Sequence, residues 1–595
     1  MNGHIPPQWP GDDAMKHLTQ QDRKREGAHY TPPLLADFVA DQICRALDRT
    51  GLSKTIRILD PAVGDGELLA ALLAKIAVAN VRDMQITAFD TDEIALALAK
   101  ERISRLGIPF PLSWQNRSFL DFALAEYAIA EGPLFSRAVE ALRFDLLIAN
   151  PPYVRTQVLG AAESRSLAYK FNLTGRVDLY HAFILAMGEA LAPGGIAGII
   201  VSNRFMTTRA GASVRKGIRQ LFDILHVWDL GDTKLFEASV LPAVLLLRRR
   251  ADTRSTKPAR FTSIYSAPEN GKQASPVQNV VRALSTKGLV RTPQGELFTV
   301  RQGTLAEGRA PHEVWRLSNE DTDSWLRAVE EHMFCNFAAI GKIRVGVKTT
   351  ADKVFIRSDW ANLPSEERPE LLRPLITHHI ARRFRARNGR LTRWILYPHT
   401  ERNGKRSAVD LEKYPSSKRY LEAHRKTLER RQYIRESGRA WFEIWVPQSP
   451  KAWAKPKLVF RDICEHPVFW IDLSGAVVNG DCYWLLADAP EAERLLWLAA
   501  AVGNSSLIEE FYDRMFNNKL YSRRRRFLTQ YVEQFPLPDP NSPVGKAIIG
   551  LAREIYDKID NPNVAAMEEE IDALVWAAFG LTQRSRAAKE SAASY

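Results

Sequence analysis

Short apolar runs that alternate with helical patterns dominate the first 250 residues of this chain. Before the first run, apolar side chains recur every three or four residues, as they do on one face of an amphipathic helix. Strands that alternate with helices predict an α/β fold with a parallel, doubly wound sheet. Both faces of such a sheet are covered, which explains why its strands are almost continuously apolar. The runs cover residues 55–59, 86–89, 144–149, 196–201, 224–228 and 240–247.

The alternation of strands and helices stops at about residue 250, and this break divides the chain. With 595 residues, the chain is long enough for two large domains. We expect an irregular lead-in over residues 1–33 and the α/β domain over 34–250. Residues 251–329 are rich in Ser, Thr, Pro, Gly and charge, which predicts a linker. A second domain of mixed α/β structure is expected over 330–583, with a tail at 584–595.

Positive charge is concentrated in the second half. Residues 1–250 hold 29 basic and 27 acidic side chains, and residues 251–595 hold 53 and 42, so these parts carry +2 and +11 of the net +13. A basic domain favours a polyanionic partner such as nucleic acid. A solvated basic surface would give the same count, so charge alone leaves both interpretations open.

Composition also argues against membranes and metals. No apolar run approaches the roughly 20 residues that span a bilayer. The first residues lack the charged-then-apolar pattern of a signal peptide, so we expect a cytoplasmic protein without a membrane partner. The four cysteines are far apart and lack the paired spacing of a zinc site. The adjacent His378 and His379 do not suit one shared metal ion, so no metal is predicted.

The first apolar run ends in a glycine-rich turn that opens a helix. Its sequence over residues 58–69 is ILDPAVGDGELL. Gly64 and Gly66 allow a sharp turn and a close approach to a ligand, and ligands of doubly wound sheets bind at the carboxyl ends of the strands. Asp90 ends the next strand, where an acid can accept from ribose hydroxyls. A tight connection without a ligand is the alternative.

This loop differs from the GxGxxG pattern of dinucleotide-binding folds. The segment GDGELL ends in Leu where that pattern has Gly or Ala, and Asp60 stands ahead of the loop. An acid in this place suits a cofactor that carries an ammonium group and no pyrophosphate. S-adenosylmethionine has those properties.

The motif Asn150-Pro151-Pro152-Tyr153 follows the apolar run 144–149. Two prolines fix the backbone and remove two N–H donors, which leaves carbonyl oxygens facing outward. The Asn150 side-chain oxygen and the Pro151 carbonyl could then accept both hydrogens of a planar NH2 group. Tyr153 offers a flat face to the ring that carries this amine. The motif predicts methyl transfer to an amino group, and a plain proline-rich turn is the alternative.

In these motifs and their order, about residues 25–250 resemble class I S-adenosylmethionine-dependent methyltransferases, and most of all the gamma-class (TaqI-like) N6-adenine DNA methyltransferases. The resemblance implies a Rossmann-like fold and catalysis by Asn150, Pro151, Pro152 and Tyr153. It also implies that Tyr153 and Phe236 hold a flipped adenine. Further matching segments are AHYTP at 28–32, LYHAF at 179–183 and LAPGG at 191–195.

The resemblance also implies a set of cofactor-binding residues. One motif departs from the family, which usually has Asp-Phe at the end of the third strand. Here RSFLDF at 117–122 places either Ser118 or Asp121 against the cofactor's adenine. The residues implied are Thr31, Asp60, Ala62, Gly64, Gly66, Asp90, Ser118, Phe119, Asp121, Asn150 and Phe183.

The second half resembles, more weakly, the TaqI-like C-terminal specificity domain, which implies DNA target recognition. Its stretch 517–527 is NNKLYSRRRRF. Arginine forks suit phosphates and guanine edges, and Asn suits adenine edges. An exposed basic helix without a partner is the alternative, and the pair 378–379 and the run 382–385 are weaker candidates. We expect DNA contacts from Asn517, Lys519, Arg523, Arg524, Arg525 and Arg526.

These observations predict a site-specific enzyme that transfers a methyl group from S-adenosylmethionine to N6 of a flipped adenine in double-stranded DNA. The simplest setting is the modification enzyme of a restriction–modification system, with a separately encoded restriction endonuclease. Protein-glutamine methyltransferases share the Asn-Pro-Pro-Tyr pattern and some RNA base methyltransferases carry a related motif, so both are alternatives. A catalytically dead specificity subunit is another. A fused nuclease is disfavoured because a lead-in of about 30 residues is too short for one.

Overall fold

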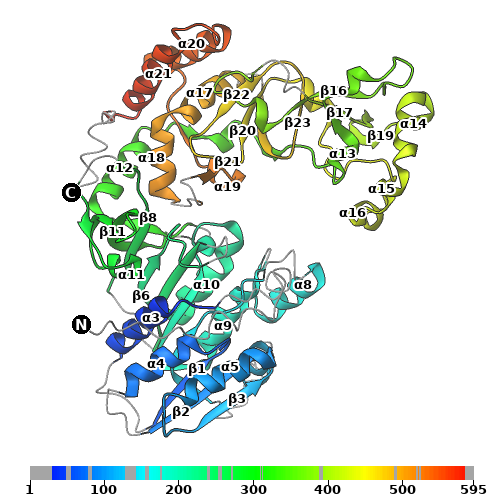
Figure 1. The fold of residues 1–595 in the computed structure, drawn as a ribbon. Helices are drawn as coiled ribbons and strands as arrows, with labels where there is room; N and C mark the ends of the chain where they lie inside the picture. Colours follow the sequence, from blue (N-terminus) through cyan, green and yellow to red (C-terminus); the bar gives the residue numbers. More distant parts are fainter. Residues whose placement is uncertain are drawn as a thin grey trace, which may run out of the picture. The chain divides into compact units, whose positions relative to one another are not determined.

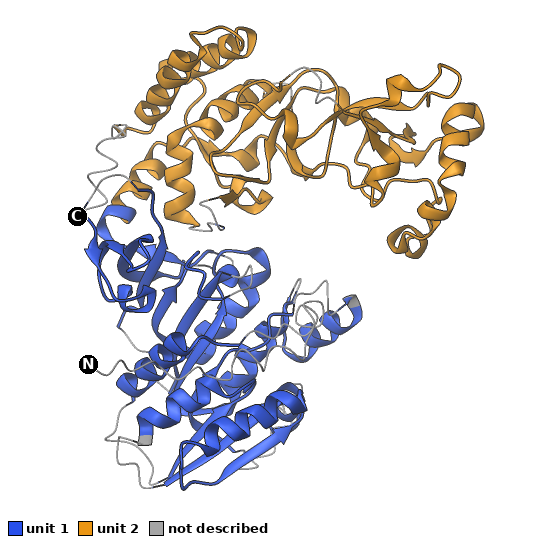
Figure 2. Ribbon diagram, viewed as in Figure 1, with its two compact units in different colours: residues 1–322, 520–522, 586–595 blue, residues 323–519, 523–585 orange. Residues whose placement is uncertain are grey.

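The structure is a computed structural model. It describes residues 30–47, 55–77, 83–127, 142–154, 160–174, 177–236, 241–251, 257–269, 273–308, 310, 313–387, 393–487, 489, 492–516, 520 and 524–582. The described residues form two compact units, one within residues 1–322 together with Leu520 and the other within 323–519 and 523–585 (Figure 2).

Unit 1 is built on one large sheet with helices on both faces (Figure 1). Strands β1 to β5 pair in parallel in the order β3-β2-β1-β4-β5, and β7 then lies antiparallel between β5 and β6. The predicted α/β class is confirmed, but the sheet is mixed. The described part of the β6–β7 connection holds no helix, and a connection without a crossover helix makes the next strand antiparallel. The strands are β1 Thr55–Asp60, β2 Asp83–Asp90, β3 Leu112–Asn116, β4 Phe144–Ala149, β5 Leu191–Ser202, β6 Phe222–Asp229 and β7 Pro242–Arg249.

Two apolar cores, one on each face of the sheet, hold the helices in place. One face is covered by α3, α4 and α5, whose buried leucines meet Ile58 and Ile86 of the sheet. The other is covered by α6, α9 and α10, which meet Leu59 and Leu147. Side chains that alternate along a strand point to opposite faces, so Ile58 and Leu59 serve different cores. The helices are α3 Pro33–Ala46, α4 Glu67–Ala77, α5 Glu93–Ser104, α6 Phe119–Glu126, α8 Ala161–Lys170, α9 Leu179–Ala190 and α10 Ala212–Leu221.

The linker predicted over residues 251–329 is wrong. This segment continues the same sheet, because β8 pairs parallel with β6 and the order then runs β8-β11-β10-β9, with β12 beside β11. Its strands bury Phe261, Ile264 and Val300 while exposing polar neighbours. A half-exposed strand contains polar residues, which made its composition look like a linker. The elements are β8 Arg260–Ser266, β9 Ser275–Pro276, α11 Val280–Ala283, β10 Gly288–Arg291, β11 Leu297–Ala306 and β12 Arg316–Ser318.

Unit 2 combines two four-stranded sheets with a helical layer, which agrees with the expected mixed α/β domain. The sheet orders are β14-β24-β20-β22 and β15-β17-β16-β23. Trp453, Trp470 and Trp484 are buried in their shared core. The strands are β14 Ile343–Val345, β15 Ile356–Arg357, β16 Leu372–Ile376, β17 Arg393–Leu396, β20 Lys457–Arg461, β22 Phe469–Asp472, β23 Val477–Val478 and β24 Cys482–Leu486.

Smaller strand pairs and helices complete this unit. The pairs are β13 Cys335–Asn336 with β26 Pro536–Leu537, β18 His399–Arg402 with β19 Lys405–Ala408, and β21 Ile463–Cys464 with β25 Arg525–Arg526. The helices are α12 Glu320–Glu331, α13 Asp352–Phe355, α14 Pro415–Ala423, α15 Arg425–Glu429, α16 Gln432–Glu436, α17 Glu493–Asn504, α18 Ser506–Met515, α19 Thr529–Val532, α20 Pro543–Asp557 and α21 Val564–Ala578. Among the helices described, none is long and apolar enough to cross a lipid bilayer.

Candidate functional site

A cavity of about 1030 Å³ opens at the carboxyl ends of β1, β2, β3 and β4 in unit 1. Parallel strands place the loops that follow them at one edge of the sheet, so residues far apart in sequence meet there. The cavity gathers most of the predicted cofactor residues, while Asp60 and Gly66 lie outside its lining. The predicted residues that line it are Thr31, Ala62, Gly64, Asp90, Ser118, Phe119, Asp121, Asn150, Pro152 and Phe183.

Asp60 is the last residue of β1 and is fully buried beside two lining residues, Pro61 and Ala62. Its Oδ1 accepts from the Ala62 N–H at 3.1 Å. Its Oδ2 has no hydrogen-bond partner among the described residues. Burial raises the pKa of this carboxyl to about 8, with smaller contributions from Asp90 and Asp65. A buried acceptor without a donor is costly, so the position suits a cation that donates hydrogen bonds.

The two glycines of the loop serve different purposes. Gly64 has φ +54° and its N–H donates to Asp90 Oδ2 at 2.8 Å. Gly66 has φ +82°, and a Cβ there would stand 2.9 Å from the Cα of Ala99 on α5. Gly66 therefore allows helix α5 to pack closely, which differs from the expectation that both glycines face a ligand.

Asp90 ends β2 with both carboxylate oxygens held by backbone groups. Besides Gly64, the Asp92 N–H donates to its Oδ1 at 2.9 Å. Burial raises the pKa of the Asp90 carboxyl, and the backbone hydrogen bonds only partly oppose this effect. Each oxygen keeps a second lone pair, so a preoriented acceptor faces the cavity. This is the arrangement that two adjacent ribose hydroxyls require.

Aromatic side chains form an apolar wall of the same cavity. The rings of Phe119 and Phe183 lie 5.9 Å apart, and Phe119 also meets Phe89 at 5.5 Å. Ser118 and Asp121, the alternative contacts for a cofactor adenine, both line the cavity next to this wall. Ser118 caps helix α6 by accepting from the Asp121 N–H at 3.3 Å. Asp121 is exposed, so its carboxylate is the more available acceptor.

Asn150 stands directly after β4 with its amide oriented by two neighbours. Its Nδ2 donates to Thr31 Oγ1 at 3.1 Å, and the Tyr153 hydroxyl donates to its Oδ1 at 2.8 Å. Burial raises the pKa of Tyr153 well above its ordinary value, so the hydroxyl stays a donor. The Tyr153 ring meets Tyr180 of α9 edge-on at 6.2 Å. The predicted motif is thus held in one orientation by residues that are distant in sequence.

A buried polar cluster joins three strand ends near Phe236. The Tyr265 hydroxyl and the Asn203 amide donate to Asp229 at 2.7 and 2.9 Å. All three side chains are at most 6% exposed. Burial raises the pKa of Asp229 to about 6. Sequence reasoning missed this cluster, which supports the turn leading from β6 to the buried Phe236.

His181 is a second residue that sequence reasoning passed over. It is 2% exposed on α9, and neither ring nitrogen has a hydrogen-bond partner among the described residues. Burial lowers its pKa to about 4, so the ring is neutral. It packs against Tyr180 at 4.4 Å between ring centroids, and Tyr180 in turn contacts Tyr153. The only sequence feature that could have drawn attention to His181 is its place in the segment LYHAF at 179–183.

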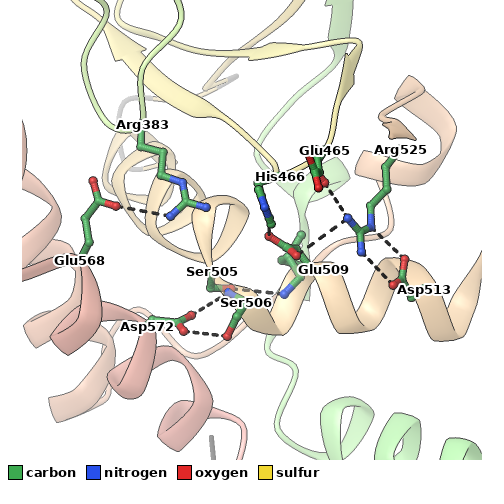
Figure 3. A network of polar contacts seen from close by, with 11 residues as sticks. Arg383, Glu465, His466, Ser505, Ser506, Glu509, Asp513, Arg525, Glu568 and Asp572 are labelled. Atoms are coloured by element: carbon green, nitrogen blue, oxygen red, sulfur yellow. Dashed lines mark hydrogen bonds and ion pairs between the residues drawn. The ribbon is translucent and has the colours of Figure 1, made fainter. Parts of the chain in front are cut away.

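The residues of the basic stretch 517–527 that the structure describes differ in exposure. Asn517, Lys519 and Arg523 lie outside the described residues, and Arg524 is exposed. Arg525, expected to contact DNA, is instead only 9% exposed and forms a bidentate ion pair with Asp513 at 2.8 Å (Figure 3). Its guanidinium also donates to the Glu465 carbonyl at 2.6 Å. Arg525 is used inside the fold, because strand β25 turns its side chain inward.

Three further arginines that were candidates for DNA contact form ion pairs within unit 2. Arg526 binds Asp462 through two contacts of 3.2 Å. In the run 382–385, Arg382 binds Asp560 and Arg383 binds Glu568, so these side chains fasten the hairpin of α20 and α21 (Figure 3 shows the second pair). Among the described residues, no group of three or more His, Cys, Asp or Glu side chains could hold a metal ion.

The fold and the position of the cavity define a class I methyltransferase unit. Residues 84–236 match the Eco57I restriction-modification methylase family, and residues 402–537 match the TaqI-like C-terminal specificity domain. The chain is 37% identical to the type II methyltransferase M.BanIII of Aneurinibacillus aneurinilyticus, over 94% of this chain and 98% of that protein. It therefore belongs to the type II methyltransferases of restriction–modification systems.

Two more distant proteins also match over at least 90% of this chain. M.PaeR7I of Pseudomonas aeruginosa is 25% identical over 96% of this chain and 94% of its own length. A solved DrdV–DNA complex matches with a TM-score of 0.50 and 12% identity, over 90% of this chain and 58% of that one. At that identity the match concerns the fold alone.

Proposed function

We propose that this chain transfers a methyl group from S-adenosylmethionine to N6 of adenine in double-stranded DNA, as the modification enzyme of a restriction–modification system. The single observation that carries the proposal is Asn150 at the cavity edge, with its amide oriented by Thr31 and Tyr153. Membership of the methylase family and the specificity domain support DNA as the acceptor. The enzyme would work in the cytoplasm beside a separately encoded restriction endonuclease.

The cofactor fits the residues that are present. Asp60 offers a buried, unpartnered oxygen for an ammonium group, and Thr31 is placed to meet a carboxylate. Asp90 offers acceptors for ribose hydroxyls, and Phe119 and Phe183 offer an apolar wall for a purine. When bound, S-adenosylmethionine supplies an activated methyl group on its sulfonium.

Asn150 and Pro151 would position the acceptor amine. The Asn150 oxygen and the Pro151 carbonyl accept the two amine hydrogens, which directs the nitrogen lone pair towards the methyl group. Positioning of this kind supplies much of the acceleration in such a transfer. The target adenine must first leave the duplex, at a cost of a few kcal/mol. Tyr153 and Phe236 would hold the extruded ring, and the Tyr153 hydroxyl would release Asn150 as the amine arrives.

The test is modification mapping on DNA from a methylation-free host that expresses the chain. We expect N6-methyladenine at one short sequence motif, and none with Asn150→Ala. Removing a group that orients or stabilises the transition state typically costs about 100-fold or more in turnover. Binding of S-adenosylmethionine by Asn150→Ala, measured by calorimetry, should stay close to that of the unaltered protein. Sustained adenine methylation by this variant would contradict the proposal.

A matched substitution separates acceptor chemistry from folding. Asn150→Asp keeps the size of the side chain and one acceptor oxygen but loses the donor to Thr31. We expect it to fold and to retain a measurable fraction of the activity that Asn150→Ala loses. If the unaltered protein binds the cofactor and yet modifies no adenine, RNA and protein glutamine become the acceptors to test.

A further inference from the structure

More than half of the chain's net positive charge lies in one short segment of unit 2. Residues 402–439 contain twelve Lys and Arg against five Asp and Glu, a net charge of +7 out of +13 for the whole chain. The segment comprises the tip of the β18–β19 hairpin and helices α14, α15 and α16. In unit 2 these helices lie at the opposite end from α20 and α21 (Figure 1). We call residues 402–439 the basic lobe.

Most cations of the basic lobe are exposed and unneutralised. Three ion pairs involve Lys413, Lys418 and Arg425, and two further arginines, Arg431 and Arg439, donate to backbone carbonyls. The remaining cations form no ion pair with any described residue. They are Arg402, Lys405, Arg406, Arg419, Lys426, Arg430 and Arg435. This contrasts with Arg525 and Arg526, whose charges are used inside the fold.

The backbone that carries these cations is firmly anchored. Arg431 is 7% exposed, and its guanidinium donates to the carbonyls of Thr349, Glu443 and Trp441. Leu421 and Leu428 are fully buried in the core of unit 2. A surface held in this way loses little conformational entropy when it binds a partner.

The N-terminus of α14 is fastened to the rest of the unit as well. The Glu370 carboxylate accepts from the N–H groups of Ser416 and Ser417 at 2.9 and 2.8 Å. These hydrogen bonds and the Ser417 hydroxyl lower the pKa of Glu370 against the effect of its partial burial. The helix is therefore fixed at its start, and the cations beyond it stand on a preformed support.

An exposed aromatic stack accompanies the charge. Tyr433 is 57% exposed and stacks on Trp445 at 5.2 Å between ring centroids. The guanidinium of Arg439 lies 5.1 Å from the centre of the Trp445 ring. Arginine and aromatic side chains that share a surface are suited to nucleic acid, where phosphates meet the cations and sugars or bases pack on rings.

We propose that the basic lobe binds the phosphate backbone of double-stranded DNA. The inference rests on the proposed function for the choice of DNA as partner. Each Lys or Arg that neutralises a phosphate releases counterions, so it steepens the dependence of affinity on salt. The lobe therefore supplies affinity that does not depend on sequence, while other loops of unit 2 read the bases.

The test compares three triple variants of the full-length chain. One neutralises the hairpin (Arg402→Gln, Lys405→Gln, Arg406→Gln) and one the helices (Lys426→Gln, Arg430→Gln, Arg435→Gln). The control neutralises two exposed cations of α20 and one that directly follows it (Lys546→Gln, Arg553→Gln, Lys558→Gln). Binding to a short fluorescein-labelled duplex of mixed sequence is measured by anisotropy over a range of salt concentrations, with folding checked by circular dichroism.

We expect each lobe variant to weaken duplex binding and to flatten the plot of log Kd against log salt. Three lost contacts should lower the slope by about 2.7, since each phosphate contributes roughly 0.9. The α20 control should keep the slope of the unaltered protein. Folded lobe variants with an unchanged slope would overturn the proposal, as would an equal loss in the control.

Methylation of plasmid DNA, measured with the same proteins, separates this inference from the proposed function. Lobe variants should raise the KM for DNA and leave kcat within about twofold, because they lie outside the cavity in unit 1. If the unaltered chain binds the duplex through the lobe but forms no N6-methyladenine, the proposed function fails and the binding surface stands. If it methylates adenine and the lobe variants match it in KM and slope, the surface fails alone.

Discussion

The cavity region of unit 1 and the pair Arg525 and Arg526 of unit 2 differ in how their charged side chains are satisfied. In unit 1 the cavity leaves acceptors open, and Asp60 keeps a buried oxygen without a donor. In unit 2, Arg525 forms ion pairs with Asp513 and Glu509 and donates to the Glu465 carbonyl, and Arg526 pairs with Asp462. A buried polar group that lacks a hydrogen-bond partner within the protein indicates where a ligand could bind. A charged group whose partners are all within the protein supports the fold, even where its sequence pattern predicts a binding site.

The largest effect is expected where a completed pair is broken. Arg525→Ala removes a buried cation and leaves the half-buried Asp513 without it, so the free energy of unfolding should fall by up to about 3–5 kcal/mol. Arg524→Ala, on the exposed neighbour, should change it by less than about 0.5 kcal/mol. Urea denaturation of both variants measures the difference. Equal free energies of unfolding for the two variants would show that Arg525 contributes no more to stability than the exposed Arg524.

The next effect concerns the open acceptor. Asp60→Asn should weaken binding of S-adenosylmethionine by about 1.5–3 kcal/mol, the range for a hydrogen bond to a charged group. That corresponds to roughly 10- to 150-fold in Kd by calorimetry. The control Glu163→Gln changes an exposed acid that lines the cavity beside Asp60, and this variant should bind nearly normally. Comparable losses in both variants would show that Asp60 has no special place.

The same carboxyl should make ligand-free stability depend on pH. Its pKa is raised from 3.8 to about 8 by burial, so the folded state holds the proton more tightly than the unfolded chain does. The contribution of the protonated Asp60 carboxyl to the free energy of unfolding is therefore intact below pH 4 and is lost as the pH rises towards 8. The difference in stability between Asp60→Asn and the unaltered protein should grow over this range, by at most about 1.4 kcal/mol per pH unit. A constant difference in urea denaturation from pH 5 to 8 would contradict this.

The smallest effect is expected at Tyr153. Tyr153→Phe removes the hydrogen bond to Asn150 but keeps the ring, so kcat should fall by about 0.5–1.5 kcal/mol, roughly two- to thirteen-fold. Tyr153→Ala also removes the flat face, and stacking on one base contributes about 1–3 kcal/mol. Steady-state kinetics on plasmid DNA compares the two. Equal losses for Phe and Ala would place the role of Tyr153 in its hydroxyl and contradict a contribution from the ring.

The sequence predicts unit 1 better than unit 2 for physical reasons. Asn150 follows an apolar strand and precedes two prolines, so local chemistry alone places it at the end of β4. The cluster of Asn203, Asp229 and Tyr265 could not be predicted, because three separate strand ends bring it together. Each of these residues looks like an ordinary polar residue in its own segment.

Local patterns misled where tertiary pairing decides the outcome. Residues 251–329 look like a linker by composition, yet β8 and β11 find partners in the large sheet. Arg524 and Arg525 are neighbours of the same type, but Arg524 precedes strand β25 and is exposed, whereas Arg525 begins the strand and is buried. No count of charges distinguishes them until the pairing of β21 with β25 is known.

The open oxygen of Asp60 has a consequence for the life of the protein in the cell. A ligand that binds only the folded state stabilises it in proportion to the logarithm of its concentration. Proteases remove the unfolded fraction, so changes of 1–2 kcal/mol can alter abundance several-fold. On the proposed function, a cell rich in methyl donor would keep more of this protein, and a cell starved of the donor would lose the substrate and the catalyst together.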